Sequence, residues 1–175
     1  MRIRLLRLCA AALLGILAAA PDGRCRQDPD LASPPTVDRV VVYKSKRLLE
    51  LRSGQNLIRS YRVALGRNPV GPKVRAGDFR TPEGIYRLDR RSLQSRFFRS
   101  IHISYPNTED IATARKQGVS AGGDIMIHGL PTGFEDLGPS HASFDWTKGC
   151  IAVTNAEMTE IWHLVRNGTP IEILP

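Results

Sequence analysis

The side chains best suited to chemistry are one cysteine and one histidine, which lie well apart in the sequence. Cys150 stands in "DWTKGC" before the apolar run "IAV", and His128 stands in "DIMIHGLP" after the apolar run "IMI". A glycine adjoins each of them, so we expect both at strand ends, where a rigid sheet fixes a side chain and a loop admits a substrate. A thiol of ordinary pKa is only roughly 3% ionised at pH 7, so it needs a neighbouring base to act as a nucleophile. An imidazole is such a base, and the two residues together predict nucleophilic catalysis.

The residues just before Cys150 extend this prediction. Gly149 permits a close approach of the backbone, so the amides of Gly149 and Cys150 are candidate donors to a developing oxyanion. Lys148 either contacts a substrate carboxylate or stabilises the Cys150 thiolate, or it is a solvated loop charge. Thr147 is a further candidate for substrate contact.

Two other interpretations stay open from residue types alone. Free cysteine is among the most buried residue types, so Cys150 can be a small core residue and His128 a hydrogen-bonded strand histidine. The second alternative is a zinc site, whose candidate ligands are His102, His128, His141 and Cys150. Short ligand pairs typical of zinc sites do not occur among them, so we predict no metal and no cofactor. His163 lies in a predicted helix and is expected only to pack or to be solvated.

Short β-rich runs separated by turns predict a mainly β domain from about residue 37 to 175. Strands are expected at 40–43, 47–52, 57–65, 84–92, 99–106, 125–127, 151–153 and 171–174, the first three as an antiparallel meander. Between them, "GRNPVGPKVRAGDFRTPEG" has many turn residues and few apolar ones. We therefore predict one long loop there, and long ordered loops are often functional.

Two helices are predicted on this β domain, at about 107–117 and 155–167. The first begins with capping residue types and acids and stops at Gly118. Thr154 and Glu157 have the spacing of a capping box at the start of the second. Apolar residues repeat at helical spacing in this second helix and are expected in the core: Met158, Ile161, Trp162 and Val165.

The first 20 residues have the layout of a secretory signal peptide, with arginines ahead of an apolar run and small residues at its end. The run from Leu8 to Ala20 would form a helix of only about 20 Å, short of the roughly 30 Å hydrocarbon core of a membrane. Pro21 leaves the cleavage point open, and residues 21–36 look like a flexible linker. The residues before Cys25 do not suit a lipidated cysteine. We expect an exported protein of the periplasm or cell wall.

The charge of the chain is compatible with a location at the cell wall. The formal net charge is +8, and removal of residues 1–20 takes away three arginines and no acid, which leaves +5. A basic surface suits an anionic partner such as a cell-wall polymer, or it is simply solvated. Export argues against a nucleic-acid partner.

Three motifs carry a resemblance to a known family. They are "GDFRTPEGIYRL" at 77–88, "IMIHG" at 125–129 and "TKGCIAVTNAEM" at 147–158. In these motifs the chain resembles the L,D-transpeptidase catalytic domain, also called YkuD, from about Val37 to Leu174. The resemblance implies a β-sandwich or barrel of mixed sheets that carries the two predicted helices.

The resemblance also implies an activity. Cys150 would be the nucleophile and His128 the general base and acid, with the backbone carbonyl of Gly129 orienting the imidazole. Such enzymes attack peptidoglycan stem peptides after the third residue, at its L-centre. D-Alanine leaves, a thioester forms on the cysteine, and an amine takes the acyl group without a cofactor.

Departures from the family pattern leave the acceptor open. Many members have Arg or Asn where this chain has Ala152, and His where it has Lys148. The stretch "SRFFRSIHISYPNTED", with His102 and Tyr105, resembles a branch that includes cross-linking enzymes and one that cleaves a peptidoglycan-lipoprotein link. His102 and Tyr105 are therefore candidate substrate contacts, and a wall-linked lipoprotein is a candidate partner. A hydrolase and a non-catalytic wall-binding β domain are the alternatives, and the oligomeric state is not predicted.

Overall fold

The computed structural model describes residues 36–175, so the predicted signal peptide (1–20), Cys25 and almost all of the predicted linker lie outside the described residues. Eight strands make up most of the regular structure: β1 (Arg39–Tyr43), β2 (Leu48–Ser53), β3 (Asn56–Arg62), β4 (Gly84–Ser95), β5 (Phe98–Ile103), β6 (Met126–His128), β7 (Ile151–Ala152) and β8 (Pro170–Leu174). The helices are α1 (Thr108–Lys116), α2 (Asn155–Leu164) and a 3-10 segment (Glu135–Ser143). The predicted mainly β fold is confirmed.

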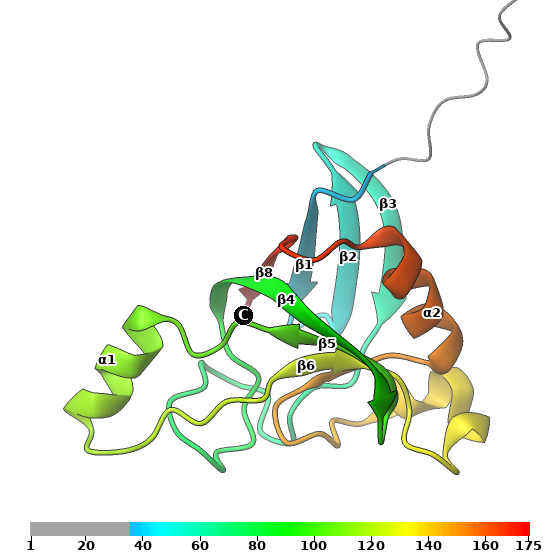
Figure 1. Ribbon diagram of the computed structural model, residues 1–175. Helices are drawn as coiled ribbons and strands as arrows, with labels where there is room; N and C mark the ends of the chain where they lie inside the picture. The colour runs from blue at the N-terminus through cyan, green and yellow to red at the C-terminus, as the bar shows by residue number, and fades with distance from the viewer. Residues whose placement is uncertain (1–35) are drawn as a thin grey trace, which may run out of the picture. The chain divides into compact units, whose positions relative to one another are not determined.

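The strands follow one continuous order, β3-β2-β1-β8-β4-β5-β6-β7. β1, β2 and β3 form the predicted antiparallel meander, whereas the β1·β8 and β6·β7 pairs are parallel, so the sheet is mixed. β4 joins the two halves, because its first four residues pair with β8 and the remainder pairs with β5. In Figure 1, β4 sweeps from β8 across to β5 and β6, which run below the meander.

One hydrophobic core lies between these elements. It combines alternate residues of the strands with the inner face of α2: Val40, Val42, Leu49, Leu51, Leu88, Ile101, Ile103, Ile127, Ile151, Met158, Ile161, Ile171 and Ile173. Side chains alternate between the two faces of a strand, so the partners of these residues along each strand point away from the core. At β6 and β7, this alternation decides which side chains face the core and which face the side of the sheet away from the core.

The two predicted α-helices are present, and both begin with a capping box. α1 is capped by Asn107 and Gln117, so the helix is one residue shorter at each end than the predicted 107–117. α2 ends at Leu164, three residues before the predicted end. The backbone of Val165 is extended (φ −97°, ψ 132°), so the helix ends before it. The side chain of Val165 is 1% exposed, and its burial in the core accounts for this conformation. The turn at Gly168 (φ 86°) then leads into β8.

A 3-10 segment at Glu135–Ser143 was not predicted. It consists of two short turns that meet at Gly138, which has a positive φ of 47°, and Pro139 follows. These two residues break any helical periodicity, so the sequence reads as a loop there. None of the helices within residues 36–175 is long and apolar enough to span a membrane.

The predicted long loop is confirmed between β3 and β4. Its first residues lie alongside the segment that carries Cys150, with an antiparallel bridge from Ala64 to Ala152 and a parallel bridge from Gly66 to Thr147. Gly66 N also donates to Thr81 Oγ1 at 3.0 Å, which ties the two ends of the loop together. β7 is therefore flanked by β6 on one side and by this loop on the other.

Candidate active site

The parallel pairing of β6 with β7 brings His128 and Cys150 onto one face of the sheet. Ile127 pairs with Ile151 and His128 pairs with Ala152. Both isoleucines are fully buried in the core, so His128 and Ala152 face the other side. Cys150 precedes Ile151 by one position and therefore shares the face of His128, on the neighbouring strand.

Three neighbours fix the imidazole of His128, which is only 2% exposed. Nδ1 lies 2.7 Å from the carbonyl oxygen of Gly129. A carbonyl only accepts hydrogen bonds, so Nδ1 carries the hydrogen and Nε2 keeps a free lone pair. The ring of Phe97 lies 4.4 Å away between centroids, and that of Trp146 meets the imidazole edge-on at 5.8 Å.

The surroundings of His128 keep its imidazole neutral at physiological pH. Burial lowers the pKa of His128 to about 4; the hydrogen bond to Gly129 opposes this, and the charge of His141 adds to it. A neutral imidazole with a free Nε2 is able to accept a proton.

Cys150 rests as a thiol. Its side chain is partly exposed, and Sγ donates to the carbonyl oxygen of Asp124 at 3.6 Å. Burial raises the pKa of Cys150, although the backbone amide of Met126 acts in the opposite direction. The negative charge of Asp124 raises this pKa further, and the positive charge of Lys73 lowers it. With a neutral thiol and a neutral imidazole on one face, a proton transfer is required to generate a nucleophilic thiolate.

Thr147 shapes the turn that presents the sulfur. Its hydroxyl donates to Cys150 O at 2.7 Å and accepts from Gly149 N at 3.0 Å, and the residue is 4% exposed. The structure gives Thr147 a positioning role in place of the predicted substrate contact. Because the Gly149 amide is engaged in this turn, the amide of Cys150 remains as the candidate oxyanion donor of the predicted pair.

Gly149 itself is required by the close approach of two loops. Its φ is 129°, and a Cβ at this position would lie 2.6 Å from the carbonyl oxygen of Arg80. Arg80 belongs to the motif at 77–88, so this motif packs directly on the turn that carries Cys150. The same turn is anchored by Asp145, which accepts from Leu65 N at 2.9 Å and pairs with Arg47 at 2.7 Å.

The other predicted substrate contacts differ in their placement. Tyr105 is 3% exposed and donates to Ala121 O at 2.9 Å, so the structure places it in the core. His102 pairs with Asp89 at 2.7 Å. The register sets His102 opposite Met126, on the face that carries His128. Lys148 is exposed and makes no hydrogen bond or ion pair within residues 36–175.

Several residues that the sequence analysis passed over help to build the site. Asn155 Oδ1 accepts from Leu130 N at 2.8 Å and would lie 2.4 Å from a Cβ at Gly129, so the start of α2 fixes the loop after His128. In the sequence, Asn155 reads only as the first residue of a helix. Phe97 and Trp146 have no signal of their own in the sequence, because their proximity to His128 arises from tertiary packing. His141, considered above only as a zinc ligand, is buried, and its charge lowers the pKa of His128.

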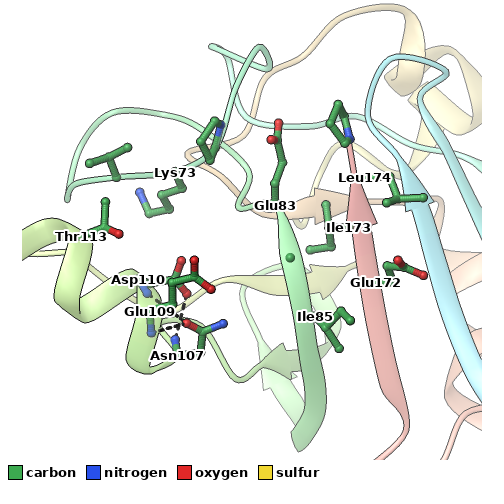
Figure 2. A pocket seen from close by; sticks show the side chains of 14 residues that line it. Lys73, Glu83, Ile85, Asn107, Glu109, Asp110, Thr113, Glu172, Ile173 and Leu174 are labelled. Atoms are coloured by element: carbon green, nitrogen blue, oxygen red, sulfur yellow. Dashed lines mark hydrogen bonds between the residues drawn. The ribbon is translucent and has the colours of Figure 1, made fainter.

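Two hollows of the surface differ in their relation to the candidate site. A cavity of about 650 Å³ lies between the start of α1, the start of β4 and the end of β8; Figure 2 shows Lys73 among its lining side chains. Its lining includes neither His128 nor Cys150. A second, apolar hollow of about 220 Å³ is lined by Pro131, Phe134, Leu137, Phe144 and Trp146, and it reaches the site through Trp146. Within the described range, no three His, Cys, Asp or Glu side chains gather in a way that would hold a metal ion.

Comparisons with known proteins identify the family of this chain. The L,D-transpeptidase catalytic domain family, YkuD, matches residues 37–173. YafK of Escherichia coli strain K12, named as a candidate L,D-transpeptidase, is 33% identical over 132 residues, which is 72% of this chain and 46% of YafK. The chain thus spans about half the length of this relative.

Solved structures have the same fold. The helical cell shape determining protein Pgp2 from Campylobacter jejuni superposes with a TM-score of 0.60 at 24% identity, over 78% of this chain and 47% of Pgp2. Bd1075 of Bdellovibrio bacteriovorus gives 0.55 at 25% identity, over 79% of this chain and 48% of Bd1075. The family match spans nearly all of the described residues and includes both strand ends that form the site. The chain therefore belongs to the family of L,D-transpeptidase catalytic domains, YkuD.

Proposed function

We propose that this protein is a cysteine acyltransferase that acts on the stem peptides of peptidoglycan outside the cytoplasmic membrane. The observation that carries the proposal is the shared face of His128 and Cys150 on β6 and β7, with His128 Nδ1 bound to Gly129 O. In this arrangement Nε2 is the free base, and the thiol is its proton donor. Membership in the family supports the stem peptide as substrate.

The first half of the reaction forms a thioester. His128 Nε2 takes the proton of Cys150 Sγ while the sulfur attacks the carbonyl carbon of the third residue of the stem. The amide of Cys150 donates to the oxyanion of the tetrahedral intermediate. The carbon–nitrogen bond then breaks, and His128 returns its proton to the amine of the departing D-alanine.

The second half of the reaction transfers the acyl group. An acceptor amine gives a proton to His128 as its nitrogen attacks the thioester carbon. The carbon–sulfur bond breaks, the sulfur regains a proton from His128, and a new amide is released. Hydrolysis differs only in that water takes the place of the amine.

Replacement of the nucleophile tests the proposal. We expect purified protein to release D-alanine from tetrapeptide stems, and Cys150→Ala to lower this release to background, because no thioester can form. Cys25→Ala is the matched control, since it removes a thiol that lies far from the site in sequence, and it should retain full release. Unchanged release by Cys150→Ala contradicts the proposal and favours a wall-binding domain.

The acceptor is tested separately. Ala152 is fully buried on the face of His128, so this chain has no polar side chain where many relatives have Arg or Asn. Analysis of muropeptides by mass spectrometry distinguishes the possibilities: new 3→3 cross-links indicate transfer, whereas tripeptides or loss of wall-bound lipoprotein indicate hydrolysis. Pgp2 is named as a determinant of helical cell shape, so cell shape is a useful additional readout.

A further inference from the structure

Two arginines from neighbouring strands gather around one tryptophan of α2. The guanidinium carbon Cζ of Arg91, on β4, lies 3.9 Å from the centre of the Trp162 ring, and that of Arg99, on β5, lies 5.6 Å from it. Among the residues that the structure describes, no carboxylate forms an ion pair with either guanidinium group. The cluster therefore holds two positive charges and no negative one.

Each guanidinium group also has a buried donor without an acceptor. Arg91 Nη2 donates to the carbonyl oxygen of Trp162, but Arg91 Nε is buried and finds no acceptor within residues 36–175. Arg99 Nη1 is likewise buried and unpartnered there, and the side chain of Arg99 makes no other hydrogen bond in this range. Buried donors are normally satisfied, because a donor left without an acceptor costs free energy.

The electrostatics of the cluster favour an anion. Burial lowers the pKa of Arg91, and the positive charge of Arg99 lowers it further. The negative face of the indole ring offsets part of this cost, since cations are attracted to it. Buried charges are ordinarily paired with charges of opposite sign. A bound anion would supply that opposite charge and the missing hydrogen-bond acceptors together.

The arginine pair lies on the face of the sheet opposite to His128. Arg91 pairs with Ile101 between β4 and β5, and Ile101 is buried in the core. Arg99 precedes Ile101 by two positions and shares its face. Ser100 faces the other way and pairs with His128. Both arginines are half-buried, so a small ion can reach their guanidinium groups from solvent.

We infer that Arg91, Arg99 and Trp162 form a binding site for a terminal phosphate group, separate from the candidate active site. A guanidinium group binds two oxygens of a phosphate or carboxylate with parallel hydrogen bonds. A carboxylate has two oxygens and a single charge, which one arginine satisfies. A terminal phosphate has three free oxygens and a charge of about −1.5 to −2 near neutral pH, which matches two arginines.

This site goes beyond the proposed acyl transfer and does not depend on it. The cluster contains neither Cys150 nor His128. Cys150→Ala should therefore bind phosphate as tightly as the wild type, even though it should release no D-alanine. Failure of the acyltransferase proposal and failure of the phosphate site thus give different results.

The experiment is a titration of the full chain with inorganic phosphate at constant ionic strength, followed by ¹H–¹⁵N NMR. The backbone amides of Arg91, Arg99 and Trp162 should show saturable shifts. Arg91→Gln and Arg99→Gln should each raise the apparent Kd by about tenfold, because a charged fork is lost. Arg99→Lys keeps the charge without the fork and should bind with intermediate affinity. Arg115→Gln, on the exposed end of α1, removes the same charge elsewhere and should leave the Kd unchanged.

Two further probes define the ligand. Glycerol 3-phosphate tests for an organic phosphate: tighter binding of this ester than of inorganic phosphate indicates a lipid or sugar phosphate, and the reverse indicates the free ion. Acetate, a carboxylate, should bind at least about tenfold more weakly than either.

The spectrum away from the cluster establishes that each variant is folded. Because Arg99 makes no side-chain hydrogen bond within residues 36–175, its variants remain informative even if Arg91→Gln does not fold. The inference is overturned by equal affinity for phosphate in the wild type and Arg99→Gln, or by an equal loss in Arg115→Gln. Acetate that binds as tightly as phosphate, or shifts that do not saturate, would overturn it as well.

Discussion

At the scale of single residues, the candidate site combines two neutral groups, the imidazole of His128 and the thiol of Cys150. The pKa of His128 is lowered mainly by burial, and that of Cys150 is raised by burial, so the proton rests on sulfur at neutral pH. Base catalysis by His128 then needs only that Nε2 remain unprotonated, which holds at any pH well above about 4. The thiol is less prone to unwanted oxidation than a standing thiolate would be.

Burial of the neutral imidazole predicts a pH dependence of stability. The pKa of His128 is about 4 in the folded protein and about 6.5 in the unfolded chain, so the unfolded state binds the proton more readily between these values. The free energy of unfolding should therefore fall by about 3 kcal/mol as the pH drops from 6.5 to 4, at about 1.4 kcal/mol per pKa unit. Urea denaturation of the wild type and of His128→Gln between pH 6.5 and 4 measures this fall in the free energy of unfolding. The variant should not show it, because it lacks the imidazole that binds the proton. An equal loss of stability in both proteins contradicts the prediction, and His163→Gln, on the exposed face of α2, should behave as the wild type.

At the scale of elements, the turn before β7 holds Cys150 in place through one hydroxyl, that of Thr147. Thr147 satisfies the Gly149 amide and the Cys150 carbonyl, while Asp145 ties the start of the turn to Leu65 and Arg47. The sulfur is thus oriented by the turn, and the turn is oriented by the long loop.

Removal of that hydroxyl should loosen the turn. In Thr147→Val two backbone groups lose their partner, so we expect a loss of about 1–2 kcal/mol of stability and at least a tenfold decrease in kcat for D-alanine release. Thr147→Ser keeps the hydroxyl and should retain most of both. Chemical denaturation and steady-state kinetics measure the two effects, and full activity in Thr147→Val would show that Cys150 does not depend on this turn.

At the scale of the whole molecule, a buried ion pair fastens the long loop to the sheet. Lys44, which directly follows β1, is 2% exposed, and its Nζ donates to Glu83 at 2.7 Å, Gly71 O at 2.7 Å and Thr81 O at 2.9 Å. Burial lowers the pKa of Lys44, and the hydrogen bond and charge of Glu83 oppose that change. Both ends of the loop are tied to one point of the fold, so the part that contacts Gly149 is placed by the sheet.

Loss of this lysine should destabilise the whole domain. Lys44→Met leaves a partly buried carboxylate and two carbonyls without their partner, so we expect a loss of about 3 kcal/mol in the free energy of unfolding. Lys46→Met is the matched control, because Lys46 is exposed, and its effect should stay within about 0.5 kcal/mol. Thermal and urea unfolding of both variants test the prediction; a loss below about 1 kcal/mol for Lys44→Met would show that the loop is held by other contacts.

The sequence by itself determined the strands, the two capped helices and the candidate pair His128 and Cys150. These depend on local signals: alternation of apolar residues, capping-box spacing and glycines beside reactive side chains. The early end of α2 and the 3-10 segment were missed, because burial of Val165 and the backbone of Gly138 are matters of packing and turn geometry.

The tertiary structure alone decided what surrounds the sulfur. The parallel register of β6 and β7 sets His128 and Cys150 on one face, and no local pattern encodes a parallel pairing. Thr147 became a turn residue and Tyr105 a core residue because their hydroxyls found backbone partners. Arg80 lies 69 positions before Gly149, and only the folded loop brings its carbonyl against the turn that carries Cys150. The electrostatic environment of a residue depends on its distances to other groups in space, and the order of residue types in a sequence does not give these distances.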